Sequence, residues 1–314
     1  MATAHAQLSP LSEMRVKEYP RRYPWRWVAA IVILALVGWV IWTLAGADIV
    51  WAHVLPYVGM DVFVQAAINT LVLAVASQAL AIAIGVVMAI LRISHNPVAR
   101  TVSIVYIWLF RGLPVLVQLL LWYNLALVFT SIKLGVPFTD VVFFSAPTNA
   151  VMTPFVAGLL GLSLNESAYM AEIIRAGING IDKGQTEAAH SLGMSPMSTI
   201  TRIVLPQAMR IIIPPTGNDF INMIKTTSMA SVITYVELVR AANMVASRNL
   251  EVMETLFAAA IWYMILVSLA SIGQYYLERM FTQSRGPGLF ASVWRSVVRP
   301  PMARVKMERI QADV

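Results

Sequence analysis

The chain has 314 residues, of which 58% are hydrophobic and only 12% are charged, and its mean hydropathy is +0.70. A soluble domain carries about 25% charged residues, so this composition excludes most cytosolic enzymes and indicates an integral membrane protein. The sequence contains no cysteine, which excludes disulfides, a thiol nucleophile and zinc–thiolate sites. All four histidines lie outside the apolar segments, so we expect neither catalytic residues nor a metal site within the membrane.

Six apolar segments are long enough to cross a bilayer, whose hydrocarbon core of about 30 Å requires about 20 helical residues. We expect spans near 28–46, 62–91, 101–130, 152–175, 211–236 and 256–278. The first segment could instead be a signal peptide, because Ala45-Gly46-Ala47 resembles a cleavage site. Its length, its two tryptophans and the long segment before it favour a retained helix.

The distribution of basic residues predicts the orientation. With both termini in the cytoplasm, 18 of the 23 Lys and Arg residues lie inside and only three lie outside. This bias follows the positive-inside rule and explains the net charge of +7 without a nucleic-acid partner. We therefore expect residues 1–27 and the basic tail 281–314 to be cytoplasmic, with Arg285 to Arg309 lying on membrane lipids of negative charge.

A long inside loop, residues 176–206, separates the fourth and fifth spans, and loops of this length are usually functional or structured. Gln185 to Met194 is predicted to form a short helix that Gly193 breaks. Ser195 followed by Pro196 predicts the start of a second helix, with serine as N-cap and proline at the first helical position. Pro206 should stop or kink it. The alternative to a functional helix–turn–helix is an interfacial amphipathic hairpin.

The residues of this loop match the EAA signature of permeases of ATP-binding-cassette (ABC) importers. The signature is E-A-A, three residues, G, nine residues, I, one residue and L-P, and its positions here are Glu187, Ala188, Ala189, Gly193, Ile203, Leu205 and Pro206. Other segments, such as Phe110-Arg111-Gly112-Leu113-Pro114 and Lys225-Thr226-Thr227-Ser228, resemble the polar amino acid branch, often called the histidine/glutamine/arginine permease family. The resemblance covers about residues 62–280.

The resemblance implies an all-α membrane protein: a type I ABC importer transmembrane domain, with a five-helix core in 62–280 and an additional transmembrane helix at 28–46. In such importers of the bacterial cytoplasmic membrane, the permease pairs with a second copy or a paralogue. Two cytoplasmic ATPase subunits bind ATP and Mg, and an extracytoplasmic solute-binding protein delivers the substrate. This chain has no G-x-x-x-x-G-K-[ST] phosphate loop, so we expect no cofactor here and no enzymatic activity of its own.

The resemblance also implies that 187–194 is the coupling helix, which docks in a cleft of the ATPase. Such a site needs small side chains for close seating and one charge to set the register. Ala188, Ala189 and Gly193 would supply the former and Glu187 the latter. Docking would convert closure of the ATPase into a rocking motion of the helices, which is alternating access.

Polar residues within the apolar segments form the second candidate site, because charges at membrane depth are rare and mark function. Asn218, Asn222 and Lys225 are spaced by four and three residues and so share one helix face. The predicted substrate path comprises Asn69, Glu166, Glu172, Asn218, Asp219, Asn222 and Lys225. We expect it to hold a zwitterionic amino acid, with Glu166 or Asp219 near the ammonium. The alternative is helix–helix contacts and ion pairs, such as one between Lys225 and a carboxylate.

Small residues recur at every fourth position in the second apolar segment and predict a packing seam. They are Ser77, Ala81, Gly85 and Ala89. Arg111, between Phe110 and Gly112, is expected to brace a kink rather than contact substrate.

The alternative function is an ion-coupled secondary transporter of amino acids, which would show paired, interrupted helices in corresponding halves. The sequence has no clear internal repeat.

Overall fold

The computed structural model describes residues 24–136 and 141–281 and divides the chain into two compact units. In the first unit, which runs to Asp48 and resumes at Ser284, the described residues form α1 (Pro24–Ala45). Its apolar side chains are exposed, as expected of a helix surrounded by lipid. It covers the predicted span at 28–46 and begins slightly earlier. Nearly all of the predicted terminal segments 1–27 and 281–314 lie outside the described residues, as does the expected lipid contact of the basic tail.

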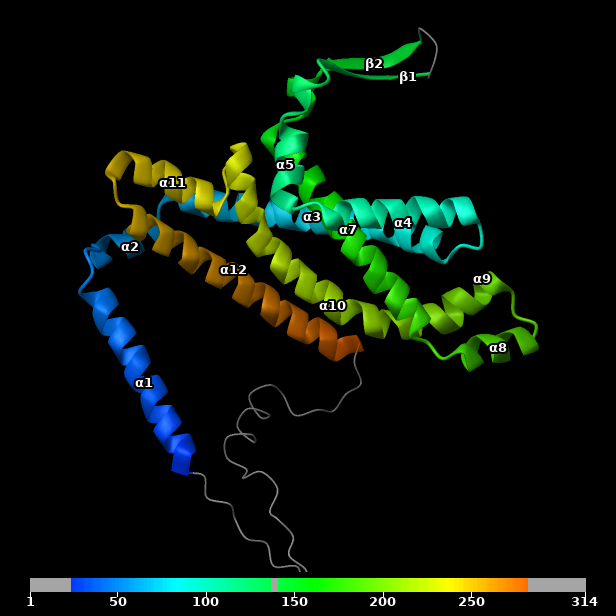
Figure 1. The fold of residues 1–314 in the computed structure, drawn as a ribbon, viewed down its shortest axis with the longest axis horizontal. Helices are drawn as coiled ribbons and strands as arrows, with labels where there is room; N and C mark the ends of the chain where they lie inside the picture. The colour runs from blue at the N-terminus through cyan, green and yellow to red at the C-terminus, as the bar shows by residue number, and fades with distance from the viewer. Residues whose placement is uncertain (1–23, 137–140, 282–314) are drawn as a thin grey trace, which may run out of the picture. The chain divides into compact units, whose positions relative to one another are not determined.

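The second unit, Ile49–Gln283, contains the main helices that pack against one another (Figure 1). These are α2 (Trp51–Val58), α3 (Asp61–Ile93), α4 (Pro97–Gly112), α5 (Val115–Tyr123), α7 (Pro154–Asn179), α10 (Leu205–Thr226), α11 (Leu238–Asn249) and α12 (Val252–Phe281). Shorter elements join them: the 3₁₀ helix η2 (Leu125–Leu127), α6 (Thr148–Val151), α8 (Lys183–Ser191), α9 (Pro196–Thr199), the π-helix η3 (Ile200–Val204) and the 3₁₀ helix η4 (Thr227–Ile233).

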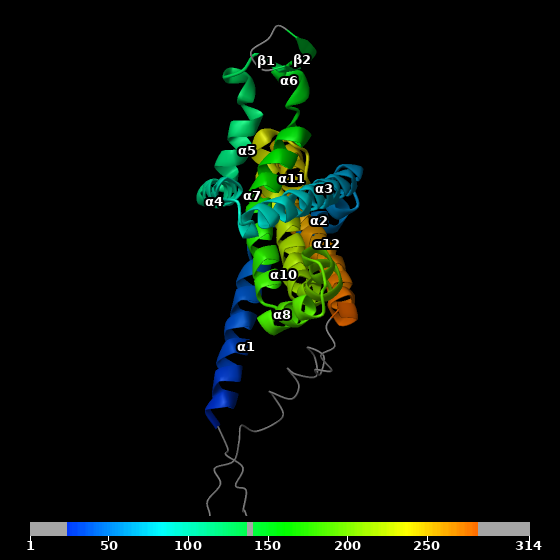
Figure 2. The same ribbon diagram turned by 90° about the vertical axis from the view of Figure 1, so that its right-hand side faces the viewer.

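Helices α3 and α7 cross closely at the centre of this unit (Figure 2). The predicted packing seam makes this approach, because Ser77, Ala81, Gly85 and Ala89 are all buried. A Cβ atom added to Gly85 would lie only 2.6 Å from the Cβ of Met170, so the contact needs a residue without a side chain. The prediction of a small-residue seam is therefore confirmed.

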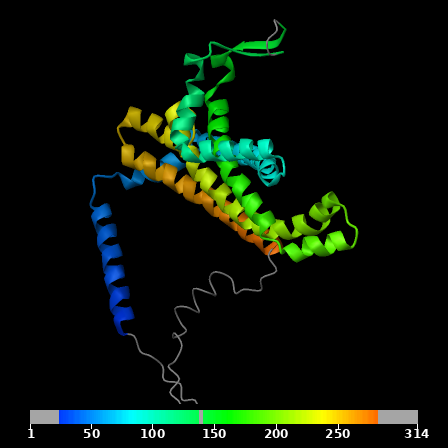
Figure 3. The same cartoon turned by 45° about the vertical axis from the view of Figure 1, so that its right-hand side comes forward.

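Helices α10 and α12 run side by side (Figure 3). Pro214 and Pro215 lie inside α10, where each lacks the amide that a helix normally uses. The side chain of Gln274 on α12 lies against Gly217 of α10 and donates to the carbonyl oxygen of Pro214 at 3.3 Å. The proline pair is thus tied to the neighbouring helix.

The spans differ from the expectation of six continuous segments. Among the described residues, three helices are long and apolar enough to cross a membrane, or five if each of two bent pairs counts as one span. Helix α7, the predicted fourth span, is not among them. Its glycine, serine, asparagine and glutamate residues make it less apolar than α3 and α12.

The predicted third span is broken. Helices α4 and α5 meet at 98° around Leu113 and Pro114, since proline cannot donate the amide that would continue the helix. The side-chain amide of Gln118 donates to the carbonyl oxygens of Phe110 and Leu113, each at 3.0 Å. Asn165 donates to Phe110 from α7 at 2.8 Å. Two amide side chains therefore satisfy the carbonyls that the break exposes.

Arg111, predicted to brace this kink, contacts α7 and makes none of the hydrogen bonds to the exposed carbonyls. Arg111 is exposed and its guanidinium lies over the ring of Tyr169, 4.9 Å from the centroid, where it makes a cation–π contact. A second departure from an all-helical chain is the antiparallel hairpin of β1 (Ser131–Gly135) and β2 (Val142–Pro147). It lies at the opposite end of α7 from α8 (Figure 2).

Candidate functional site

The EAA loop forms two short helices beside each other, α8 and α9, at the end of α7 (Figure 1). Asp182 caps α8 by accepting from the amide of Gly184 at 2.6 Å, and Ser195 caps α9 by accepting from Ser198 at 3.3 Å. Gly193 turns the chain between them with φ +76°, a conformation that L side chains rarely adopt. The predicted break at Gly193 and the predicted start at Ser195 and Pro196 are confirmed.

The side chains of α8 divide into an outer and an inner set. Glu187 and Ala188 are exposed, and Leu192 beyond them is 83% exposed. Ala189 is buried, so its small size serves the packing of the loop itself and not direct contact with another protein. A cavity of about 600 Å³ beneath the loop is lined by Thr186, His190 and Thr199, among others. The surface available for docking is therefore the face of Glu187, Ala188 and Leu192.

The second half of the signature lies at the junction of α9 and α10. Pro206 was expected to stop or kink the helix, but the helix continues through it. The preceding turn, η3, widens so that the amide of Leu205 donates to the carbonyl of Ile200, five residues earlier. The side chain of Gln207 donates to the carbonyl of Ile203 at 2.8 Å. The wide turn thus lies directly before Pro206, which lacks the amide hydrogen that an α-helix normally uses.

The predicted substrate path is brought together in part. Glu166 on α7 and Asp219 on α10 lie close enough to interact electrostatically, and we call them the carboxyl pair. Two negative charges so close would repel, so a cation or a shared proton beside them would stabilise the pair. Glu166 Oε1 is buried and has no hydrogen-bond donor among the described residues.

The rest of the α10 face is open. Asn218, Asn222 and Lys225 are all exposed in the single chain, as their shared spacing predicts. In the described ranges Lys225 makes no salt bridge, so the alternative of a permanent ion pair between Lys225 and a carboxylate finds no support. The face is available to line a path or to meet a second subunit.

Two predicted path residues make structural contacts elsewhere. Glu172 accepts from Arg175, at 2.9 Å from Nε and 2.6 Å from Nη2, and lies 3.8 Å from Arg92. Asn69 donates to the carbonyl of Val236 at 2.9 Å, which joins α3 to the turn before α11. None of these contacts of Glu172 and Asn69 involves Glu166 or Asp219.

A further buried acidic residue, at the start of α11, escaped notice in the sequence. Glu237 is fully buried and caps α11, accepting from the amides of Val239 and Arg240 at 2.9 and 2.7 Å. It also accepts from the hydroxyl of Tyr263 on α12 at 2.6 Å. The only sequence signal is an acidic residue just before a helical segment, which is a common N-cap pattern.

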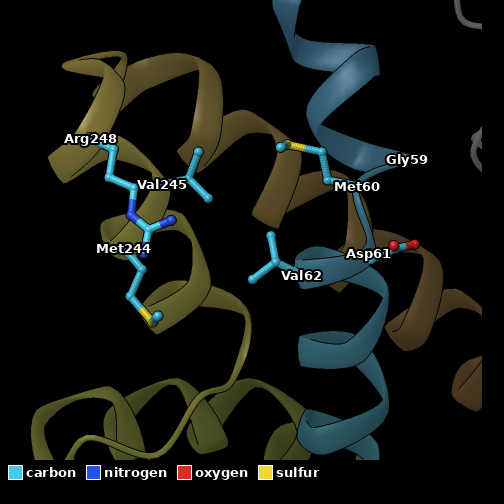
Figure 4. A pocket seen from close by; sticks show the side chains of 7 residues that line it. All are labelled: Gly59, Met60, Asp61, Val62, Met244, Val245 and Arg248. Carbon is cyan, nitrogen blue, oxygen red and sulfur yellow. The ribbon is translucent and has the colours of Figure 1, made fainter.

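At the far end of α12 from Phe281, a polar cluster joins α2 to the start of that helix. The carboxylate of Glu251 accepts from the hydroxyl of Tyr57 at 2.6 Å and contacts His53 Nδ1 at 2.9 Å. The Tyr57 hydroxyl and then His53 hold the pKa of Glu251 below its ordinary value. A neighbouring cavity of about 600 Å³ lies between the α2–α3 turn and α11 (Figure 4). The side chains of Arg248 and Met244 lie together on one side of it and Val62 lies on the other, whereas Asp61 points away.

Comparison with known proteins identifies this architecture. Residues 81–283 match the family described as binding-protein-dependent transport system inner membrane component. The arginine transport system permease protein ArgU of Corynebacterium glutamicum is 41% identical over 268 residues, which are 85% of this chain and 83% of that protein. The probable amino-acid permease protein YxeN of Bacillus subtilis is 39% identical over 221 residues, 70% of this chain and 91% of that protein.

A solved structure agrees. The crystal structure of an amino acid ABC transporter with histidines contains a chain that is 34% identical, with a TM-score of 0.60 over 70% of this chain and 94% of that one. The fold is that of a type I ABC importer permease, and the relatives give no support to an ion-coupled transporter. The protein is a multi-pass component of the cytoplasmic membrane and a transport subunit without enzymatic activity. Both its helical architecture and its similarity to these relatives place this chain in the family of inner membrane components of binding-protein-dependent transport systems, the permeases of ABC importers.

Proposed function

We propose that this permease moves a polar amino acid across the cytoplasmic membrane by alternating access, driven by ATP hydrolysis on separate ATPase subunits. The support is the EAA loop together with relatives whose names specify arginine or amino-acid transport. A cationic amino acid such as arginine is the first candidate substrate, because the carboxyl pair offers two acidic groups and the adjoining face offers amides.

The observation that carries this proposal is the way in which the EAA loop exposes Glu187 and connects to α10. Capped helices and a glycine turn hold Glu187 on an exposed surface, and a continuous helical path from Pro196 leads into α10. A force applied to α9 would therefore reach Asp219 along a continuous helix, and Asp219 belongs to the carboxyl pair. ATP and Mg would bind the partner ATPase, and this chain would transmit the resulting motion.

The path would be completed by a second copy or a paralogue, because Asn218, Asn222 and Lys225 are exposed in the single chain. In this arrangement Glu166 and Asp219 receive the substrate ammonium, while Glu172 and Asn69 maintain the helix packing that holds them. The loop 176–206 and both termini face the cytoplasm, as the distribution of basic residues predicts. The solute-binding protein docks at the opposite ends of the helices, near Arg248.

The coupling role is tested by two substitutions, Glu187→Arg and Gly193→Leu. The first reverses the charge on the docking face, and the second places a side chain at φ +76°. In liposomes containing the permease, its ATPase and its binding protein, both should reduce substrate-stimulated ATP hydrolysis by at least about tenfold, the effect of losing one charge-assisted contact.

The matched control is Gln185→Arg, which adds a positive charge to the same helix about half a turn from Glu187. It should retain hydrolysis and transport. Membrane abundance should be equal in all three variants. Normal uptake by both Glu187→Arg and Gly193→Leu would refute the assignment of α8 as the coupling helix.

A further inference from the structure

A second charged cavity, unrelated to the substrate path, lies where α3 ends, α4 begins and α7 ends. Its volume is about 520 Å³, and we call it the arginine pocket. Its lining consists of Arg92, Ile93, Ser94, His95, Pro97, Arg100, Arg175 and Asn179. Asn179 also lines the cavity beneath α8 and α9, so the arginine pocket lies at the same helix ends as the EAA loop.

The charges around this pocket do not balance. Its only acidic neighbour among the described ion pairs is Glu172, and the bonded partner of Glu172 is Arg175. Arg92 lies 3.8 Å from the same carboxylate, too far for a hydrogen bond, and its buried Nε has no hydrogen-bond partner in the described part of the chain. Arg100 is exposed and makes no described ion pair. Two guanidinium groups thus remain for an anion.

The helix end adds to this positive potential. Helix α4 has 16 residues and begins at Pro97 beside the pocket, and Asn96 caps its first amides. The N-terminus of such a helix carries a partial positive charge that favours a nearby anion. Guanidinium groups suit phosphate in particular, because their planar N–H groups match its oxygen atoms.

We propose that the arginine pocket binds the phosphate headgroup of an anionic phospholipid in the cytoplasmic leaflet. Exposed apolar residues adjoin the pocket on both helices that frame it: Ile90 and Ile93 on α3, and Val98 and Val102 on α4. A phosphate with acyl chains satisfies the arginines and covers these side chains, whereas a free phosphate satisfies the arginines alone. Basic pockets at the cytoplasmic ends of membrane helices are suited to such headgroups.

The proposed lipid would act as a fixed element beside the EAA loop. Arg175 and Asn179 belong to the last turns of α7, which lead directly into α8. A headgroup held by Arg92 and Arg100 therefore joins the α3–α4 turn to the helix end that carries the loop. The inference rests on the proposed function only for its orientation, in which this end faces the cytoplasm.

The test uses the full-length permease purified with its ATPase in a mild detergent. Phosphatidylglycerol is titrated in, phosphatidylcholine serves as the neutral comparison, and native mass spectrometry measures the lipid retained. The paired variant Arg92→Gln with Arg100→Gln should weaken phosphatidylglycerol retention by at least about tenfold, since each arginine contributes to binding an anionic lipid. Arg100→Gln alone should show a smaller loss, and its exposed position avoids any effect on folding.

The matched control is the pair Arg210→Gln and Arg279→Gln, two exposed arginines outside the pocket that remove the same total charge. This control should retain phosphatidylglycerol as the wild type does. Equal retention in the pocket variants would overturn the proposal. So would displacement of the lipid by millimolar inorganic phosphate, which would indicate a soluble anion, or loss of the ATPase with lipid retained, which would indicate a protein contact.

This outcome is separable from the proposed function. The coupling variant Glu187→Arg should keep its phosphatidylglycerol, because Glu187 is not part of the pocket lining. Failure of lipid retention in the wild type would leave the coupling assay unaffected, and failure of the coupling assay would leave the lipid measurement intact.

Discussion

The carboxyl pair is the most unusual arrangement of side chains in the protein. Glu166 and Asp219 come from different helices, and Glu166 has a buried carboxyl oxygen, so two negative charges so close would repel each other. The pair is therefore stable when it shares a proton or when a cation lies beside it. In the proposed function, a substrate ammonium takes the place of that proton.

We predict that Glu166→Gln lowers uptake by at least about tenfold, the cost of losing one charge-assisted contact with the substrate. The substitution should also shift selectivity among labelled cationic and neutral amino acids. The melting temperature in detergent should hardly change, because a glutamine amide can still donate to Asp219. A sharp fall in melting temperature with unaltered selectivity would show that the pair is structural.

Glu172→Gln is the comparison within the same helix. It removes the negative charge beside Arg175 and Arg92, although the glutamine oxygen can still accept from Arg175. A hydrogen bond to a charged group exceeds a neutral one by about 1 kcal/mol. The expected result is the reverse of that for Glu166→Gln: lower thermal stability with the order of substrate preference preserved.

The polar cluster at the start of α12 should respond to acid. Since the Tyr57 hydroxyl and His53 hold the pKa of Glu251 below its ordinary value of 4.5, the folded protein binds its proton less readily than the unfolded chain. The stabilising contribution is therefore present above that value and is lost as pH falls through the lowered pKa. Wild type should melt above Glu251→Gln at pH 7. A difference that persists well below pH 4 would contradict this linkage.

Individual residues were predictable where the signal is local. Ser195 followed by Pro196 predicts a helix start, and Gly193 predicts a break, because capping and positive φ depend only on neighbouring residues. The contact between Glu166 and Asp219 depends on how two helices pack, so sequence spacing carries no information about it. The path residues therefore remain predictions as a set, although the pair was included among them.

At the scale of helices, the α3–α7 crossing depends on one glycine. We predict that Gly85→Leu disrupts this crossing, since even a Cβ atom would lie 2.6 Å from Met170 Cβ and 3.2 Å from the backbone of Ala171. Such overpacking typically costs about 1–3 kcal/mol or more. The measurement is membrane abundance together with the detergent melting temperature.

The matched control for the crossing is Gly273→Ala on α12, where an added Cβ atom meets nothing within 4 Å. Alanine is about 1 kcal/mol better than glycine in a helix, so this variant should be neutral or slightly more stable. Equal loss of abundance in both variants would mean that helical glycine matters for some reason other than close approach.

The elements were predictable to different degrees for a physical reason. Long apolar runs identify α3 and α12 by composition alone. A kink near Pro114 was predictable, but its bracing by Gln118 and Asn165 was not, because Asn165 comes from another helix. Hairpin β1–β2 escaped notice because its strands are short and carry exposed aromatic residues such as Phe143.

For the whole molecule, the orientation can be measured in the cysteine-free background. Ser195→Cys, in the EAA loop, should resist a membrane-impermeant thiol reagent in intact cells. Lys133→Cys, exposed on β1 at the other end of α7, should react. Both should react after the membrane is made permeable. Labelling of Ser195→Cys from outside would reverse the proposed topology.

The wide turn η3 has a consequence for how the chain can vary in length. The elements α9, η3 and α10 form one continuous helical path. Each residue added to or removed from it rotates the preceding part of the chain by about 100° about the helix axis. Deleting one residue between Ile200 and Val204 would restore an ordinary turn but would swing Glu187 to another side of the α10 axis. The nine-residue interval between Gly193 and Ile203 therefore fixes the direction in which Glu187 faces relative to α10. We expect this interval to tolerate substitutions far better than insertions or deletions.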